Sequence, residues 1–218
     1  ADKVARSMIV FGQGSDVLRN FESVVGSLHN DAIAGDAGAN NLRGNNGNDT
    51  LRGAGGNDTL DGGKGFDYAS FSDATKGVKV SLAVSSAQFI SSNLGSDKLI
   101  SIEGLFGSGH ADRLVGNNSN NHLLGGSGND TLRGALGNDT LEGGAGVDTA
   151  DYTGVSAIRV NLGTTAAQNT GHGIDRLISI ESVVSGNGND HLTGSSGANR
   201  LVGNAGNDTL LGGGGSDS

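Results

Sequence analysis

A nine-residue repeat that starts with glycine organises most of this sequence. Uninterrupted copies fill three blocks, residues 26–70, 107–151 and 185–218, and give fourteen nonamers, of which the last is cut short. A representative copy, residues 44–52, reads GNNGNDTLR. Because a period this short repeats one small structural unit along the chain, the sequence predicts a solenoid rather than a domain with a single central core.

A longer period lies above the short one. Similar lead-in segments occupy residues 14–25, 95–106 and 173–184, at spacings of 81 and 78 residues, and the linkers 78–88 and 158–168 also match. We interpret the chain as about two and a half copies of one module, cut from a longer protein. The expected units are a partial module with its lead-in (1–25), block 1 (26–70), inter-block strands and lead-in (71–106), block 2 (107–151), a second inter-block segment (152–184) and a truncated block 3 (185–218).

The composition excludes several classes of protein. Glycine accounts for 41 of 218 residues, proline is absent and only 4% of residues are aromatic, which argues against collagen and against a thick two-layer core. The absence of cysteine excludes disulfides, thiolate chemistry and cysteine–zinc sites. A net charge of −9 disfavours nucleic acid and anionic membranes and favours a cationic partner, and we expect no membrane insertion.

Each position of the nonamer has a structural role. Glycine fills position 1 in thirteen of the fourteen copies and is frequent at position 4, as tight turns with positive φ require. An aliphatic residue between polar neighbours at position 8 is typical of a short strand with one side chain pointing inward. We therefore expect an all-β fold in which two short strands make one coil and two parallel sheets face each other across a ladder of leucines. The position-8 residues are Ile33, Leu42, Leu51, Leu60, Leu114, Leu123, Leu132, Leu141, Leu192, Leu201 and Leu210.

Position 6 carries the chemistry. Eleven of the 23 acidic residues share this phase: Asp31, Asp49, Asp58, Asp67, Asp112, Asp130, Asp139, Asp148, Asp190, Asp208 and Asp217. Turns on the same side of a two-stranded coil stack at the strand spacing of roughly 4.8 Å, so these carboxylates would repel one another. No lysine or arginine recurs in a phase that would neutralise them. A single Gly-Asn-Asp is ordinary turn sequence, but this many in phase favour Ca²⁺, which prefers carboxylate and carbonyl oxygens.

The repeat has little else to stabilise it. One buried leucine per nine residues offsets only a small part of the conformational entropy that nine ordered residues lose. We therefore expect the metal-free repeat to be unfolded and the ladder of calcium sites to form cooperatively.

At these residues the sequence resembles the repeats-in-toxin (RTX) family, whose nonapeptide pattern is G-G-x-G-x-D-x-U-x. The resemblance implies a right-handed parallel β-roll with Ca²⁺ in its turns, and a bacterial protein that leaves the cell by type I secretion and folds outside it. It also implies that each ion lies between turns n and n+2. Both position-6 side chains hold the ion, with carbonyls from positions 1 and 3 of one turn and positions 2 and 4 of the other.

Carried onto this chain, the pattern gives eight sites, three in each of blocks 1 and 2 and two in block 3. The carbonyl ligands implied in block 1 are Gly26, Leu28, Asn45 and Gly47 for one site and Gly44, Asn46, Gly63 and Gly65 for another. Those in block 2 are Gly107, Gly109, Gly126 and Gly128, then Gly125, Ser127, Gly144 and Gly146. Block 3 contributes Asn187, Asn204 and Gly206.

The chain departs from the pattern in places. Asn40, Asn121 and Asn199 stand at position 6 of the second nonamers, where an amide oxygen without charge predicts weaker sites with Asp58, Asp139 and Asp217. His29 and His110 replace glycine at position 4, where only a carbonyl is needed.

The lead-in segments add two sets of acidic residues. Asp16, Asp97 and Asp175 lie outside the repeat register, and whether they bind further ions is left open. Glu22, Glu103 and Glu181 share one slot, for which a structural bond to a neighbouring turn is favoured over metal ligation. We expect core positions at Leu99, Ile102, Leu105, Leu177, Ile180 and Val183, and surface positions at His122, His172 and His191.

Two functions fit these features. The first is a non-catalytic, calcium-dependent folding and secretion module, monomeric as a fragment, of a secreted or cell-surface protein. The sequence has neither H-E-x-x-H nor G-x-S-x-G, so any catalytic domain would lie elsewhere. The second is a polysaccharide-binding or stalk module like those of alginate epimerases and surface adhesins, which two tyrosines and no tryptophan disfavour. Ice binding needs a regular threonine ladder that position 3 lacks.

Overall fold

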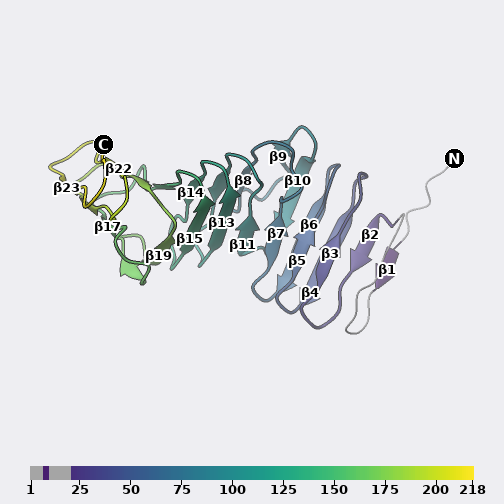
Figure 1. Cartoon of the computed structure of the whole chain (residues 1–218). Helices are drawn as coiled ribbons and strands as arrows, with labels where there is room; N and C mark the ends of the chain where they lie inside the picture. Colours follow the sequence, from purple (N-terminus) through teal and green to yellow (C-terminus); the bar gives the residue numbers. More distant parts are fainter. Residues whose placement is uncertain (1–6, 10–20) are drawn as a thin grey trace.

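The computed structural model describes residues 7–9 and 21–218, and all regular elements in this part are β-strands. The strands follow one another along an elongated solenoid, from β1 and β2 at one end to β22 and β23 at the other (Figure 1). No helix in the described part is long and apolar enough to span a membrane. The all-β parallel roll with two short strands per coil is therefore confirmed, while its handedness stays a prediction.

Four sheets form the walls of the solenoid. The first sheet contains, in spatial order, β1 (Ser7–Ile9), β2 (Ser23–Val25), β4 (Asn41–Asn46), β6 (Thr59–Lys64), β10 (Gly95–Ile100) and β9 (Gln88–Ser91). The second contains β3 (Ala32–Ala34), β5 (Thr50–Arg52), β7 (Tyr68–Ser70), β11 (Gly104–Phe106), β13 (His122–Ser127), β15 (Thr140–Ala145), β19 (Ile174–Ile178) and β18 (Gln168–Asn169).

The remaining two sheets complete the C-terminal half. The third contains β8 (Lys79–Ser81), β12 (Arg113–Val115), β14 (Thr131–Arg133), β16 (Thr149–Asp151), β20 (Ser182–Val184) and β22 (Arg200–Val202). The fourth contains β17 (Arg159–Asn161), β21 (His191–Thr193) and β23 (Thr209–Leu211). Within the blocks the partners are parallel and 18 residues apart, as in the pairing of Leu42 with Leu60.

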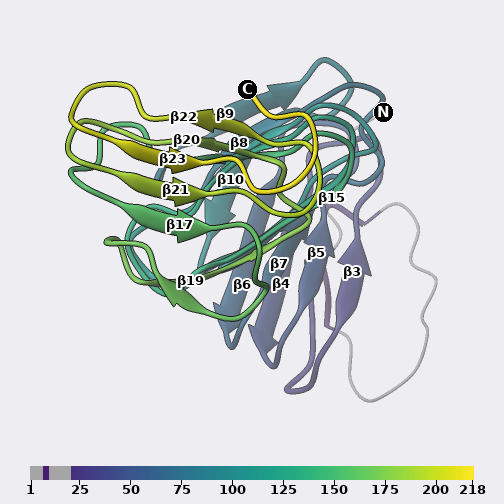
Figure 2. The same cartoon turned by 60° about the vertical axis from the view of Figure 1, so that its left-hand side comes forward.

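The facing sheets of the roll are divided at the inter-block segments, a feature that the repeat does not predict. The first sheet ends at β10, which β9 covers in an antiparallel pair, while β8 starts the third sheet. The same change recurs one module later, where antiparallel β18 covers β19 of the second sheet and β17 starts the fourth. The second sheet continues through the first inter-block segment, from β7 to β11, and the third sheet continues through the second, from β16 to β20. At each change of sheets, one wall of the roll is therefore unbroken. In Figure 2 the strands of the two ends accordingly run in different directions.

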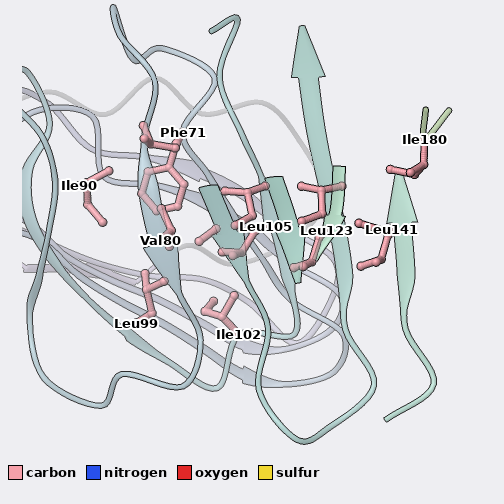
Figure 3. Packing of buried hydrophobic residues seen from close by; sticks show 14 of the residues in the cluster. Phe71, Val80, Ile90, Leu99, Ile102, Leu105, Leu123, Leu141 and Ile180 are labelled. Carbon is pink, nitrogen blue, oxygen red and sulfur yellow. The ribbon is translucent and has the colours of Figure 1, made fainter. Parts of the chain in front are cut away.

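A ladder of aliphatic side chains fills the interior of every coil. Leu105, Leu123 and Leu141 are register partners on β11, β13 and β15 and stand in a row inside the roll (Figure 3). The expected inward residues are buried at all position-8 sites except Leu210, which is 46% exposed on the terminal strand β23. All six lead-in core residues predicted from the sequence are also buried, from Leu99 to Val183. Each repeat strand contributes one aliphatic side chain to this core. The turns are the second place where a coil contacts its neighbours.

Candidate metal centres

The position-6 side chains lie inside the turns, just before the strands that the turns lead into. Burial is nearly complete for Asp49, Asp58, Asp67, Asp112, Asp130, Asp139, Asp148 and Asp190, and for Asn40, Asn121 and Asn199. Asp31 and Asp208 are half-buried, and Asp217, in the last described turn, is exposed. An aspartate is rarely buried without a partner, so the groups around these side chains decide what the turns can hold.

One carboxylate oxygen of each buried aspartate is bound by the backbone of the preceding coil. The Asp31 N–H donates to Asp49 Oδ1 and the Asp49 N–H donates to Asp67 Oδ1, both at 2.8 Å. The same bond recurs from Asn40 to Asp58, Asp112 to Asp130, Asn121 to Asp139, Asp130 to Asp148, Asp190 to Asp208 and Asn199 to Asp217. The carboxylates therefore form ladders on each side of the roll, and the backbone offsets part of the repulsion expected between them.

The second oxygen of seven of these aspartates has no hydrogen-bond donor. Buried and unpartnered Oδ2 atoms belong to Asp49, Asp58, Asp67, Asp130, Asp139, Asp148 and Asp190. Leaving a buried polar atom without a partner costs about 1–3 kcal/mol, and more when the group is charged. Seven such atoms in one repeated position fit a site for a positively charged partner.

Glycine at position 1 brings carbonyls against these oxygens. A Cβ atom at Gly44 would overlap Asp49 Oδ2 and would lie 2.6 Å from the carbonyl oxygen of Gly62. In block 2 a Cβ at Gly125 would overlap Asp130 Oδ2 and lie 2.7 Å from the Gly143 carbonyl oxygen. A side chain is therefore excluded where carboxylate and carbonyl oxygens converge. Carboxylate and carbonyl oxygens that converge in this way fit a hard cation such as Ca²⁺.

Burial also raises the pKa of the ladder carboxyls. Desolvation raises the pKa of Asp49, Asp58 and Asp130 to about 6, against the lowering effect of the backbone N–H that each accepts. The pKa of Asp139 rises to about 7 for the same reason, with the Asp175 carboxylate adding to the shift. The protein without a cation thus opposes ionisation of the groups that would bind one.

The first turns of blocks 1 and 2 differ from the later aspartate turns, because the N–H of the residue at position 2 donates to the second carboxylate oxygen. Ser27 N donates to Asp31 Oδ2 at 2.7 Å, and Ser108 N donates to Asp112 Oδ2 at 2.5 Å. In the second turns the position-2 N–H donates to the amide oxygen of the asparagine at position 6. These bonds run from Asp36 N to Asn40, from Asn117 N to Asn121 and from Ser195 N to Asn199. The amide oxygens predicted as weak ligands therefore already carry a protein donor.

The lead-in aspartates belong to the ladders, which corrects the expectation of a broken register. The Asp58 N–H donates to Asp97 Oδ1, and the Asp139 N–H donates to Asp175 Oδ1, both at 3.0 Å. Asp175 Oδ2 also accepts from Thr170 Oγ1 at 2.6 Å and from the Tyr152 hydroxyl at 3.3 Å. The third lead-in aspartate, Asp16, lies outside the described residues.

The lead-in glutamates make the structural bond favoured from the sequence. Glu103 Oε2 accepts the Asp67 N–H and Glu181 Oε2 accepts the Asp148 N–H, both at 2.9 Å. Three residues, 101–103, separate the paired segments 98–100 and 104–106, whereas six residues separate the equivalent segments 41–43 and 50–52. The longer glutamate side chain thus reaches the place that aspartate fills elsewhere. For Glu22, the backbone carbonyl accepts the Asn41 N–H at 2.7 Å.

The histidines do not join the ladders. His122, expected at the surface, is half-buried on β13, where its Nδ1 lies 2.8 Å from the Tyr68 hydroxyl. His172 and His191 are also half-buried rather than fully exposed. No group of three or more His, Asp or Glu residues in the described part of the chain gathers at one point. A cation at a ladder position would therefore have two acidic side chains at most and would need carbonyl oxygens to complete its shell.

Parallel strands joined by turns of buried carboxylates and carbonyls define a class of protein, the cation-binding β-roll. The family model for the RTX calcium-binding nonapeptide repeat matches this chain four times, at residues 34–69, 106–141, 115–150 and 184–218. These matches cover more than half of the chain, which belongs to this family of calcium-binding repeats. No curated protein matches the sequence.

The raised pKa values predict opposite effects of pH on the calcium-free fold and on calcium binding. Groups whose pKa is raised by folding stabilise the fold below their unfolded value near 3.8, and this contribution is lost as the pH rises through 6 to 7. In EDTA, the β-sheet signal in far-UV circular dichroism should therefore increase from pH 7.5 to 5.5.

Calcium affinity should change in the other direction, because protons compete for the same oxygens. Calorimetric titration should give weaker binding at pH 5.5 than at 7.5. Equal affinity at both pH values, or a calcium-free fold that loses structure on acidification, would contradict the assignment of the ladder carboxyls as ligands.

Proposed function

We propose that this chain is a calcium-loaded folding module of a larger secreted bacterial protein, which stays unfolded where calcium is scarce and folds after type I export. The observation that carries the proposal is the set of seven buried Oδ2 atoms without a donor, all at position 6 of the repeat. Extracellular calcium modules bind with dissociation constants of about 10⁻⁴–10⁻³ M, so calcium outside a cell is sufficient to fill such sites. The module has no catalytic role in this proposal.

The strongest sites lie between Asp49 and Asp67 and between Asp130 and Asp148. In these pairs both aspartates keep an unpartnered Oδ2 atom. The Asp49/Asp67 site takes the carbonyls of Gly44, Asn46, Gly63 and Gly65, and the Asp130/Asp148 site takes those of Gly125, Ser127, Gly144 and Gly146. Positive φ angles at Gly63 (101°) and Gly144 (105°) mark the same turn geometry in both blocks. Bound Ca²⁺ supplies the positive charge that the buried carboxylates lack.

The pairs that contain an asparagine should bind more weakly. Asn40 and Asn121 contribute no charge, and their amide oxygens already accept a backbone N–H. Their partners Asp58 and Asp139 each keep an unpartnered Oδ2 atom. Asp97 extends the Asp58 ladder and is a candidate for an additional ion. Asp175 is a poorer candidate, because both of its oxygens accept hydrogen bonds from the protein.

Replacing one ladder carboxylate should remove calcium without removing the turn. In Asp67→Asn the amide oxygen can still accept the Asp49 N–H, whereas the unpartnered oxygen becomes an NH₂ group. We expect equilibrium dialysis with ⁴⁵Ca to show at least one ion fewer than in the unchanged protein. Asp36→Asn is the control, since it removes the same charge from an exposed turn position. Equal calcium counts for the two variants would contradict the proposed site.

A carbohydrate-binding face is a second candidate, supported by an aromatic cluster on the second sheet. The rings of Tyr68 and Phe106 stack with centroids 4.7 Å apart, and Phe66 lies 5.4 Å from Tyr68. Beside them is a groove of about 620 Å³ that Phe106 lines together with the hydroxyl-bearing Ser70 and Ser127. Aromatic faces next to hydroxyl groups suit sugar rings.

The carbohydrate candidate predicts binding that depends on this cluster. Calorimetric titration of calcium-loaded protein with alginate oligosaccharides should release heat, and Phe106→Ala should reduce the affinity at least tenfold. Phe89→Ala, at a phenylalanine that is 66% exposed on β9, is the control. Absence of heat with acidic and neutral polysaccharides would remove this second function.

A further inference from the structure

Asn45 occupies a turn position whose neighbours the family pattern assigns to calcium. It stands at position 2 of the third nonamer in block 1, with a left-handed φ of 81°. Its side-chain Nδ2 donates a hydrogen bond of 2.8 Å to the carbonyl oxygen of Gly26, at position 1 of the first nonamer. That carbonyl is one of the ligands expected for an ion between Asp31 and Asp49.

Block 3 repeats this arrangement. Asn204, at position 2 of the third nonamer with φ of 57°, donates from Nδ2 to the carbonyl oxygen of Ser185 at 2.5 Å. Both bonds join residues 19 positions apart and connect the third turn of a block to its first. Block 2 has Gly126 at the equivalent position and therefore no side chain to make the bond.

An amide N–H and a cation are alternative partners for the same carbonyl. The amide carries its positive hydrogens on the protein itself, so it satisfies the carbonyl without an ion. In block 1 one of the two acidic side chains, Asp31, is also satisfied, because Ser27 N and Ser27 Oγ both donate to its carboxylate. The other, Asp49, keeps an unpartnered Oδ2 atom, which belongs to the proposed site with Asp67. In block 3 the Asp190 Oδ2 atom has no donor, so there the amide satisfies the carbonyl but not the carboxylate.

We propose that the side-chain amides of Asn45 and Asn204 take the place of calcium between the first and third turns of blocks 1 and 3. This inference rests on the proposed calcium ladder and reduces the eight expected sites to six. The pair Asp112/Asp130 in block 2 keeps its ion. Ser108 N donates to Asp112 as Ser27 N donates to Asp31, but Gly126 has no amide side chain that could reach the carbonyl of the first turn. The first turns of blocks 1 and 3 thus pack on the third turns without metal.

Anomalous diffraction from crystals grown with calcium chloride locates the ions directly. We expect peaks between Asp49 and Asp67 and between Asp130 and Asp148, and none next to the Gly26 or Ser185 carbonyl oxygen. A peak at the Ca²⁺–oxygen distance of roughly 2.3–2.6 Å from either of these carbonyls would overturn the inference while leaving the proposed function intact. A map without peaks at any pair would contradict both.

Removing the amides tests whether they exclude the ion. The double variant Asn45→Gly, Asn204→Gly places in both turns the residue that block 2 carries, and glycine accepts the left-handed φ without strain. We expect ⁴⁵Ca dialysis to show up to two additional ions per chain. Asn207→Gly, the same exchange at an exposed position-5 residue of block 3, should leave the count unchanged. An unchanged count in the double variant would overturn the inference.

Discussion

Every turn in the repeat blocks depends on how the buried side chain at position 6 is partnered. In each buried aspartate at this position, one oxygen accepts a backbone N–H from the preceding coil, as in the 2.8 Å bond from Asp49 to Asp67. This bond fixes the position of the carboxylate and aligns one coil on the next. The other oxygen is where the turns differ, because it is closed by a protein donor in some turns and lacks a donor in others. The distribution of these two states sets where the chain needs a cation.

The lead-in segments continue the ladders through the regions where the nonamer is interrupted. Asp97 accepts the Asp58 N–H, and Glu103 accepts the Asp67 N–H from a turn only half as long. Asp175 and Glu181 do the same one module later. The module of about 80 residues is thus one continuous stack of coils, in which a longer side chain compensates for a shorter turn.

Sequence alone predicted the parts of the structure that the repeat encodes directly. The phase of Leu42, Leu60 and their equivalents predicted the buried ladder, and the phase of Asp49 and Asp67 predicted the buried carboxylates. The change of sheets at β8 and β9 could not be predicted, because residues 71–94 carry no nonamer and strand pairing over such distances leaves no periodic signal. The bond from Asn45 to Gly26 had a weak signal, asparagine in place of glycine at position 2, but its partner is set by coil stacking.

The central claim is that calcium, by partnering the buried carboxylates, makes the fold stable. The most direct measurement is the far-UV circular dichroism spectrum at pH 7.5, first in EDTA and then with calcium added to millimolar concentration. The account predicts a largely unfolded spectrum in EDTA and a cooperative change to a β-sheet spectrum as calcium is added. A β-sheet spectrum that chelation leaves unchanged would contradict it.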